Sequence, residues 1–221
     1  MLHLEVETKF ELNADDFEHL KSVGRVTQRE EQLNVYYDAG WKLAESSTTL
    51  RIRLNSWAHA VLCLKIPVSV TGRRREMREI ELALREARPG SFESYHPATI
   101  DVSRQLPREF SDYLRYLGVD EVQRVGWVRN TRLLLEFSDA GYVELDHLKL
   151  PDGSVLHEVE IEAVNDWTRE RLAEKVCQLA PAAVPSRLSK FQRFRLAATR
   201  SVPVSQWLPK SDRETAGPSC K

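Results

Sequence analysis

The residues of this sequence that could do chemistry are carboxylates and cations that recur two positions apart. This spacing occurs in five stretches: Glu5-Val-Glu7-Thr-Lys9, Arg51-Ile-Arg53, Glu79-Ile-Glu81, Glu144-Leu-Asp146 and Glu158-Val-Glu160-Ile-Glu162. Residues at i and i+2 share one face of a β-strand, so each stretch places several charges on one side. Carboxylates bind hard divalent cations, whereas Arg and Lys bind phosphate oxygens. Together these groups could hold a metal-bound polyanion.

The sorting of charge signs between these stretches favours an enclosed site. A solvated sheet face is stabilised when opposite charges face each other on neighbouring strands, and like charges side by side need compensation. Any single pair is better explained by a solvated face. The joint occurrence of carboxylate-only and arginine-only strands instead favours charged faces that point into a closed barrel.

Alternation of polar and apolar residues predicts the strands that carry these charges. The expected strands cover residues 2–10, 32–38, 48–54, 60–66, 75–84, 125–137, 142–149 and 156–163. Turn residues separate several of them, as in Asp139-Ala-Gly141 and Pro151-Asp-Gly153. Short turns between antiparallel strands favour one β-rich domain with helices outside it.

Cap residues and apolar spacing predict the helices. Asn13 can cap a helix over residues 14–23 that ends at Gly24, and Asp166 can cap another over residues 167–179. Two further helices are expected over residues 108–117 and 186–198.

The remaining segments have little periodicity. Residues 86–107 contain Pro89-Gly90 and Pro97 and are predicted to form a loop or insertion. Residues 201–221 are predicted to be a flexible tail. A single domain over residues 1–200 is therefore expected.

The overall composition limits the classes of partner. The 221 residues include 32 Lys and Arg against 33 Asp and Glu, a formal net charge of -1. This balance argues against a broad nucleic-acid or anionic-membrane surface. Cys63, Cys177 and Cys220 are far apart, so no disulfide framework or paired metal motif is predicted. A charged N-terminal segment and the lack of a long uncharged stretch predict a cytoplasmic protein without a membrane span.

A series of short motifs along the chain carries a resemblance to a known family. The motifs, in order, are Glu5-Val-Glu7-Thr-Lys9-Phe10, Tyr36-Tyr37-Asp38, Leu50-Arg51-Ile52-Arg53, Leu64-Lys65-Ile66-Pro67, Glu79-Ile80-Glu81, Val128-Arg129-Asn130, Glu144-Leu145-Asp146, Glu158-Val159-Glu160 and Ser189-Lys190-Phe191. The first resembles the ExExK signature of the CYTH superfamily, also called triphosphate tunnel metalloenzymes, and the others follow in family order. As an ordered set spanning residues 5 to 191, they are much more specific than ExExK alone.

The resemblance implies an α+β fold, in which an eight-stranded antiparallel β-barrel forms a tunnel with helices packed around the outside. It also implies chemistry on triphosphates with Mg2+ or Mn2+. The positions that match the metal-side carboxylates are Glu5, Glu7, Glu79, Glu81, Asp146, Glu158 and Glu160. The positions that match the phosphate-side cations are Lys9, Arg51, Arg53, Lys65, Arg129 and Lys190. Direct roles in catalysis are expected for Lys9, Glu158, Glu160 and Lys190.

Several assignments stay open. Arg132 is an alternative to Arg129, because a bulge would change which face of the strand each residue occupies. Glu144 and Glu162 share faces with the metal-side carboxylates, but could equally lie at the barrel rim. The general base could be a carboxylate or a lysine. Surface or packing roles are expected for His147 and His157, and a local hydrogen-bonding or capping role for Ser189.

A small triphosphate is the favoured substrate. Vertebrate thiamine triphosphatases carry a Trp directly before the Leu-Arg of the arginine strand, where it can stack on thiamine, and this chain has Thr49 there. Packing roles are expected for Trp41, Trp57 and Trp127. We therefore expect a metal-dependent hydrolase that removes the terminal phosphate of inorganic triphosphate or a related small triphosphate. The alternatives are a thiamine triphosphatase, a class IV-type adenylate cyclase, and a non-catalytic module that binds triphosphate or polyphosphate.

Overall fold

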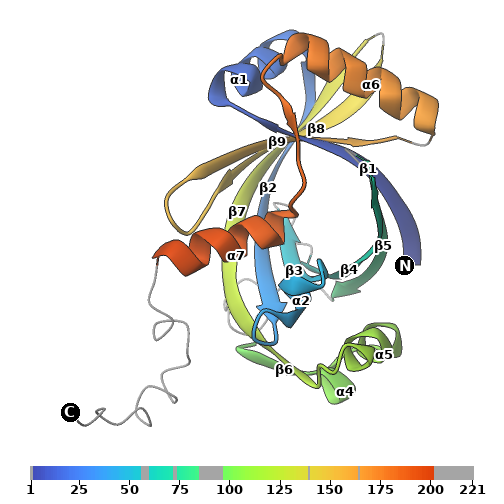
Figure 1. Ribbon diagram of the computed structural model, residues 1–221, viewed down its shortest axis with the longest axis vertical. Coiled ribbons are helices and arrows are strands. Elements are labelled where there is room, and N and C mark those ends of the chain that lie inside the picture. The colour runs from blue at the N-terminus through green and yellow to red at the C-terminus, as the bar shows by residue number, and fades with distance from the viewer. Residues whose placement is uncertain are drawn as a thin grey trace.

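The described strands close into a barrel (Figure 1). The computed structural model describes residues 2–55, 60–71, 74–84, 97–138, 140–163 and 165–201. The barrel strands are β1 (Leu2–Leu12), β2 (Arg25–Asp38), β3 (Thr49–Asn55), β4 (Ala60–Thr71), β5 (Arg74–Leu84), β7 (Glu121–Phe137), β8 (Gly141–Lys149) and β9 (Val155–Glu162). All neighbours are antiparallel, in the order β1-β5-β4-β3-β2-β7-β8-β9.

Strand β1 closes the circle because it pairs with β5 through residues 2–8 and with β9 through residues 7–12. Two short strands add to the outside of the circle. β6 (Thr99–Asp101) pairs with β7, and β10 (Val184–Pro185) pairs with β1. The predicted α+β fold with an eight-stranded antiparallel barrel is confirmed.

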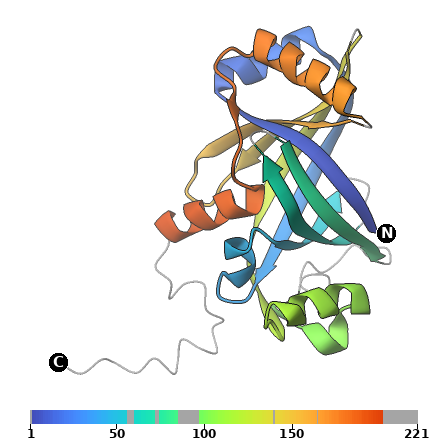
Figure 2. The same cartoon turned by 45° about the vertical axis from the view of Figure 1, so that its right-hand side comes forward.

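Helices pack outside the barrel rather than inside it. Those described are α1 (Ala14–Val23), α2 (Lys42–Glu45), α4 (Val102–Gln105), α5 (Arg108–Tyr116), α6 (Asp166–Leu179) and α7 (Lys190–Ser201). Figures 1 and 2 show α1 and α6 together across the upper end of the barrel, and α4 with α5 below its lower end. Among the described residues, no helix combines the length and apolar character needed to cross a membrane.

Apolar side chains of the helices and strands form two clusters that pack the helices against the barrel. In one cluster, Phe17 of α1 and Leu172 of α6 are buried with Leu135 and Val159 on the outer faces of β7 and β9. Burial of such side chains stabilises each by about 1.5–3 kcal/mol relative to exposure. Because alternate residues of each strand pack outward, the charged residues between them point into the barrel.

Helix α7 and strand β2 meet in the second cluster, through aromatic rings. The ring centroid of Tyr36 lies 4.8 Å from that of Phe191 and 5.2 Å from that of Phe194. This packing holds the N-terminal end of α7, and therefore Lys190, against the barrel.

The turn between β2 and β3 is held by one carboxylate. Asp38 is fully buried and accepts hydrogen bonds from the backbone N–H groups of Ala39 (2.6 Å), Leu43 (3.0 Å) and Ala44 (3.0 Å). These bonds satisfy donors at the start of α2 that have no helical partner. The turn thereby leads the chain directly into the arginine strand β3.

Part of the segment predicted to be a loop or insertion, residues 86–107, forms secondary structure. Residues 85–96 lie outside the described residues, but Thr99–Asp101 forms β6 and Val102–Gln105 forms α4. The loop alternative does not hold for this half, because Asp101 caps α4 by accepting from the N–H groups of Ser103 and Arg104. The predicted tail lies outside the described residues from residue 202 onward.

Two helix starts differ from the sequence prediction. Asn165, rather than Asp166, caps α6, because its side chain accepts from the Thr168 N–H at 2.8 Å. Helix α7 begins at Lys190 rather than at Ser186, because Ser186 is held by a backbone bond to Lys9 O at 2.9 Å after β10. Helix α1 begins after its predicted cap, Asn13.

Candidate functional site

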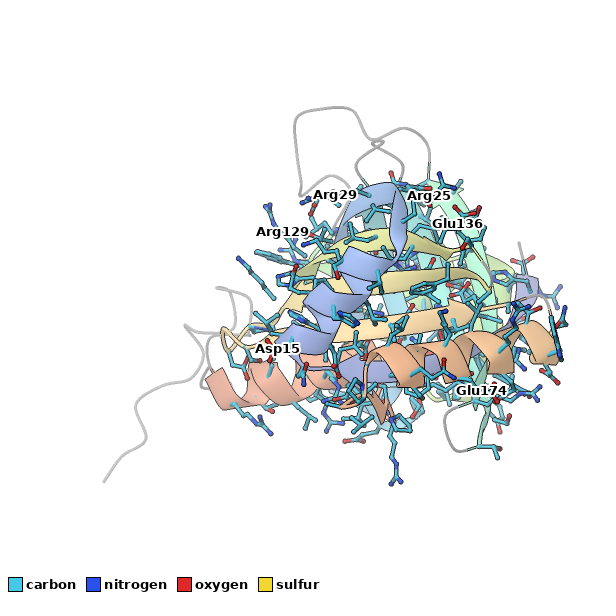
Figure 3. All side chains as sticks on the ribbon, turned by 90° about the horizontal axis from the view of Figure 1, so that it is seen from above. Asp15, Arg25, Arg29, Arg129, Glu136 and Glu174 are labelled. Atoms are coloured by element: carbon cyan, nitrogen blue, oxygen red, sulfur yellow. The ribbon has the colours of Figure 1, made fainter. Side chains whose placement is uncertain are left out.

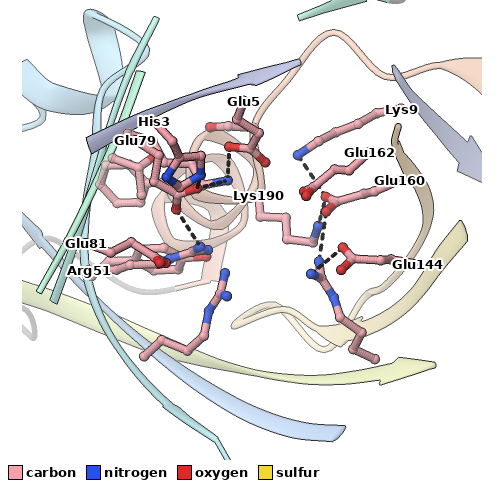
Figure 4. A pocket seen from close by; sticks show the side chains of 17 residues that line it. His3, Glu5, Lys9, Arg51, Glu79, Glu81, Glu144, Glu160, Glu162 and Lys190 are labelled. Atoms are coloured by element: carbon pink, nitrogen blue, oxygen red, sulfur yellow. Dashed lines mark hydrogen bonds and ion pairs between the residues drawn. The ribbon is translucent and has the colours of Figure 1, made fainter. Parts of the chain in front are cut away.

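A cavity of about 240 Å³ lies inside the barrel, and charged side chains make up most of its wall (Figure 4). Every barrel strand contributes at least one lining residue, and α7 adds two more. The side chains therefore converge from parts of the chain that are far apart in sequence. The closure of the barrel, rather than any local motif, brings these side chains together.

Six cationic side chains line the cavity. They are Lys9, Arg51, Arg53, Lys65, Arg132 and Lys190. Arg51 is only 6% exposed, and within the described residues its Nε and Nη2 have no hydrogen-bond partner. Burial and the neighbouring guanidinium groups of Arg51 and Arg132 lower the pKa of Arg53. Buried donors and mutually repelling cations are stabilised when anionic oxygens meet them, so this wall suits a polyanion.

Six carboxylates line the same cavity. They are Glu5, Glu79, Glu81, Glu144, Glu160 and Glu162. Lys65 Nζ lies 2.5 Å from Glu5 Oε2 and 3.4 Å from Glu79 Oε2, and Lys9 Nζ lies 2.8 Å from Glu160 Oε1. Figure 4 shows Glu5 and Glu79 on one side of the cavity and Lys9 with Glu160 on the other.

Three predicted metal-side carboxylates do not line the cavity and lie behind its wall. Asp146 and Glu158 are fully buried, and Lys190 Nζ lies 2.9 Å from Asp146 Oδ2 and 3.1 Å from Glu158 Oε2. Glu7 Oε2 lies 3.0 Å from Lys9 Nζ. In this arrangement these carboxylates hold the cations in place. Direct roles for Glu158 in catalysis and for all three in metal binding stay predictions.

The structure corrects the assignment of Arg129. Arg129 is exposed, and its guanidinium lies over the ring of Trp127, 5.9 Å from the centroid. Figure 3 shows it at the outer surface of the molecule. Arg132, three positions along β7, points inward instead, because β7 pairs Arg132 with Asp146 and Arg129 with Lys149. Arg132 Nη2 lies 2.7 Å from Asp146 Oδ2 and 2.8 Å from Glu160 Oε2.

The two carboxylates left open at the rim both line the cavity. Glu144 is ion-paired with Arg132, and Glu162 shares a hydrogen bond with Glu5. His3 and Tyr36 also line the cavity, although neither is among the predicted site residues. His3 lies two residues before Glu5 and therefore on the same face of β1, so two-residue alternation could have identified it. Tyr36 is brought to the cavity by its pairing with Arg51, which is a long-range contact.

The side chains predicted to have packing or capping roles lie as follows. His147 and His157 pack against Phe17, with His147 Nδ1 and His157 Nε2 3.1 Å apart, and neither lines the cavity. Ser189 Oγ accepts from the Gln192 N–H at 3.1 Å and thus caps α7, although Ser189 also lines the cavity.

No Trp among the described residues lines the cavity. Trp41 packs near Phe191 and Phe194, and Trp127 is half-exposed on the outer face of β7. Trp57 lies outside the described residues.

The lysines of the cavity keep their protons. Burial disfavours the charged ammonium groups of Lys9, Lys65 and Lys190, but the adjoining carboxylates outweigh it and raise the pKa of all three. A lysine acts as a general base only when it is neutral. Their role in this site is therefore that of fixed cations.

The carboxylates fit a divalent cation. Oxygen atoms of Glu5, Glu7 and Glu162 lie within 4.8 Å of one another, and so do those of Glu144, Glu160 and Glu162. Burial, the hydrogen bond to Glu5 and the nearby carboxylates raise the pKa of Glu162 well above its usual range. A hard cation with oxygen ligands would relieve this repulsion, so the donor set suits Mg2+ or Mn2+.

The raised pKa of Glu162 predicts a pH-dependent stability of the metal-free protein. The folded state holds the Glu162 proton more tightly than the unfolded state, so stability falls as the pH rises above the ordinary carboxyl pKa. With a chelator present, we expect Tm to fall between about pH 5 and pH 8, and Glu162→Gln to make that fall shallower. Thermal unfolding over this pH range measures the effect, and parallel Tm curves for the two proteins would contradict it.

Comparison with known proteins gives one family match. The family model described as CYTH domain matches residues 3–195. No curated protein matches the chain.

Solved structures share the fold at low sequence identity. HpAC1 from Hippeastrum, a candidate adenylyl cyclase with a dominant triphosphatase activity, is 22% identical with a TM-score of 0.70, and the match covers 90% of this chain and 98% of that one. A Bacillus halodurans protein described as a candidate adenylate cyclase is 21% identical with a TM-score of 0.67, and the match covers 87% of this chain and 98% of that one.

Proposed function

The chain belongs to the CYTH domain family, and from this premise we propose that it is a divalent-metal-dependent triphosphatase. Its substrate is inorganic triphosphate or a related small triphosphate, from which it removes the terminal phosphate. The observation that carries this proposal is the cavity inside the barrel, whose wall holds six cations and six carboxylates.

The charge of the cavity supports a triphosphate as its ligand. A triphosphate chain carries about four negative charges at neutral pH, and its binding needs several fixed cations together with a divalent ion. Arg51 has buried guanidinium donors that find no hydrogen-bond partner in the described part of the chain, and Arg53 is destabilised by the cations beside it. Phosphate oxygens would accept hydrogen bonds from Arg51 and would offset the positive charge around Arg53.

The wall carboxylates are the residues that would hold the metal. Glu5 with Glu162, and Glu144 with Glu160, bring their oxygens close enough to share an ion. A bound divalent ion would polarise a phosphoryl oxygen and neutralise charge in the transition state.

The chain's own residues supply positioning and charge neutralisation. Water oxygen attacks the terminal phosphorus, the bond from that phosphorus to the bridging oxygen breaks, and phosphate and diphosphate leave. A wall carboxylate accepts the proton of the water, since Lys9, Lys65 and Lys190 keep their own protons. The arginines and lysines stabilise the negative charge that develops on the bridging oxygen.

The make-up of the wall favours a small substrate. Its described aromatic residues other than His3 are Tyr36 and Phe191, and both are buried in contact with each other. Thr49 lines the cavity where a thiamine-stacking Trp would be expected. An organic group therefore finds no open aromatic ring on the described part of this wall.

A substrate panel tests this function. The protein is incubated with tripolyphosphate, thiamine triphosphate or ATP, each with Mg2+ or Mn2+, and the products are identified. We expect phosphate release to be fastest from tripolyphosphate. A preference for thiamine triphosphate, or cyclic AMP and pyrophosphate from ATP, would replace the proposal with a thiamine triphosphatase or a cyclase. Binding without any product would indicate a binding module.

Tyr36 is predicted to donate a hydrogen bond to the substrate. Its hydroxyl is fully buried at the cavity wall with no partner in the described structure, and burial raises its pKa, so it keeps its proton. Loss of one such bond corresponds to about 0.5–1.5 kcal/mol. We therefore expect Tyr36→Phe to raise KM for tripolyphosphate by roughly 2- to 12-fold with little change in kcat.

The neighbouring Tyr37 provides the control for this prediction. Its hydroxyl donates to Pro97 O at 3.2 Å, outside the cavity. Tyr37→Phe removes the same atom and is expected to leave KM unchanged. Equal KM values for Tyr36→Phe and the wild type would show that the Tyr36 hydroxyl does not contact the substrate.

A further inference from the structure

A buried thiol lies directly behind the carboxylate side of the cavity. Cys63 is on the inner face of β4, where it pairs with Arg51 of β3 and Glu81 of β5. It is 1% exposed, and its Sγ donates to Glu79 Oε1 at 2.8 Å. Burial first, and then the carboxylate of Glu79, raise the pKa of Cys63 to about 11 despite nearby Arg51. The thiol therefore carries its proton as long as no cation replaces it.

Cys63 makes one group of potential ligands chemically different from the others. Ligand atoms of Cys63, Glu79 and Glu81 all lie within 4.8 Å of one another. The two other such groups in the described part of the chain contain only carboxylates. A sulfur ligand favours Zn2+ and Cd2+ over the hard ions Mg2+ and Mn2+, because soft thiolates select softer metals.

The charges around this group show what must accompany the metal. Lys65 Nζ lies 3.4 Å from Glu79 Oε2, His3 Nε2 lies 3.4 Å from the same atom, and Arg51 Nη2 lies 3.8 Å from Glu79 Oε1. The ammonium group of Lys65 and the guanidinium group of Arg51 oppose a bare divalent ion. The buried Nε and Nη2 of Arg51, which have no hydrogen-bond partner among the described residues, can instead bind anionic oxygens. A metal that arrives on a triphosphate brings those oxygens with it.

We propose that Cys63, Glu79 and Glu81 form a site for a thiophilic divalent cation, Zn2+ or Cd2+, bound together with the triphosphate in the cavity. A bond forms between the metal and Sγ of Cys63, and the thiol proton passes to solvent. The phosphate oxygens bind Arg51 and Lys65, which frees Glu79 for the metal. The inference rests on the proposed function only for the identity of the anion.

Spectroscopy tests this site without relying on turnover. The chain has three Cys residues, so a Cys177→Ser/Cys220→Ser parent leaves Cys63 as its single thiol. The parent is titrated with Cd2+ in the presence of equimolar tripolyphosphate, and the ultraviolet thiolate-to-cadmium charge-transfer band is recorded. Cys63→Ser in the same parent is the matched comparison, with Cys63→Ala as a second variant if the serine protein does not fold.

We expect the parent to develop the band to saturation at one Cd2+ per chain, and the variant lacking Cys63 to show none. Loss of Cys63 should also weaken Cd2+ binding by roughly tenfold or more. Absence of the band in the folded parent, or an equal band without Cys63, would overturn the inference. Phosphate release by the same parent with Mg2+ is measured separately. A band without turnover would contradict the proposed function but support the Cys63 site. Turnover without a band would support the proposed function but contradict the Cys63 site.

Discussion

Arg132→Ala is expected to lower kcat/KM for tripolyphosphate by roughly 10²–10³-fold, the size of loss seen when one preorganised donor is removed from an active site. Arg132 lines the cavity and contacts Asp146, Glu144 and Glu160. Its removal also takes the main counter-charge from Asp146 and Glu144 and one of several from Glu160, which is expected to destabilise the fold by about 3–5 kcal/mol. Initial rates of phosphate release and thermal unfolding measure the two effects.

The neighbouring Arg129 provides the control. Arg129→Ala removes the same side chain from the same strand, but at an exposed position over Trp127. Both kcat/KM and Tm are expected to match those of the wild type. Arg132→Lys keeps a positive charge and should recover part of the activity if the loss is electrostatic. A large loss in Arg129→Ala with little change in Arg132→Ala would mean that β7 presents the opposite face to the cavity.

Glu160→Gln is expected to lower kcat by roughly 10²-fold or more while tripolyphosphate binding persists. Glu160 lies 2.8 Å from both Lys9 and Arg132, and it also pairs with Lys190. Glutamine has the same shape without the charge, so the proposed metal ligand is weakened and three cations lose a charged partner. Those cations then remain available for phosphate. Steady-state rates over a Mg2+ titration, and calorimetric titration with tripolyphosphate, separate turnover from binding.

An equivalent change at the surface shows whether charge alone matters. Glu174 is exposed on α6, away from the cavity (Figure 3). Glu174→Gln changes the net charge of the protein by the same amount and is expected to leave kcat unaltered. Unchanged kcat in Glu160→Gln would remove this residue from the catalytic machinery.

Two-residue alternation was sufficient to predict the inner faces of several strands. On β9, Glu160 and Glu162 both line the cavity, and on β3 so do Arg51 and Arg53. These strands are short and regular, so like charges at i and i+2 reveal the face directly. Helix α1 was also predictable, because the bond from Asp16 N–H to Asn13 Oδ1 is entirely local.

The face of β7 could not be derived in the same way. This strand is 17 residues long, and its register against β2 shifts between Tyr36 and Tyr37. Alternation counted from its ends therefore does not fix which of Arg129 and Arg132 points inward. The cross-strand pairing of Arg132 with Asp146 decides this, and that pairing is a long-range property of the barrel.

Distant parts of the chain also determine whether a carboxylate lines the cavity or lies buried behind its wall. Asp146 shares its strand face with Glu144, yet only Glu144 lines the cavity. Lys190, at the start of α7, covers Asp146 and Glu158 from inside the barrel. Helix α7 is held in this position by the packing of Phe191 against Tyr36. No pattern within β8 or β9 could therefore reveal that Lys190 covers these carboxylates.

The most direct test of the central claim is phosphorus NMR of tripolyphosphate incubated with the protein and Mg2+ or Mn2+. If the cavity binds a triphosphate and cleaves its terminal phosphate, the triphosphate signals will give way to equal amounts of orthophosphate and pyrophosphate. A chelator will prevent this conversion. Unchanged tripolyphosphate signals in the presence of the folded protein and either metal would contradict the account.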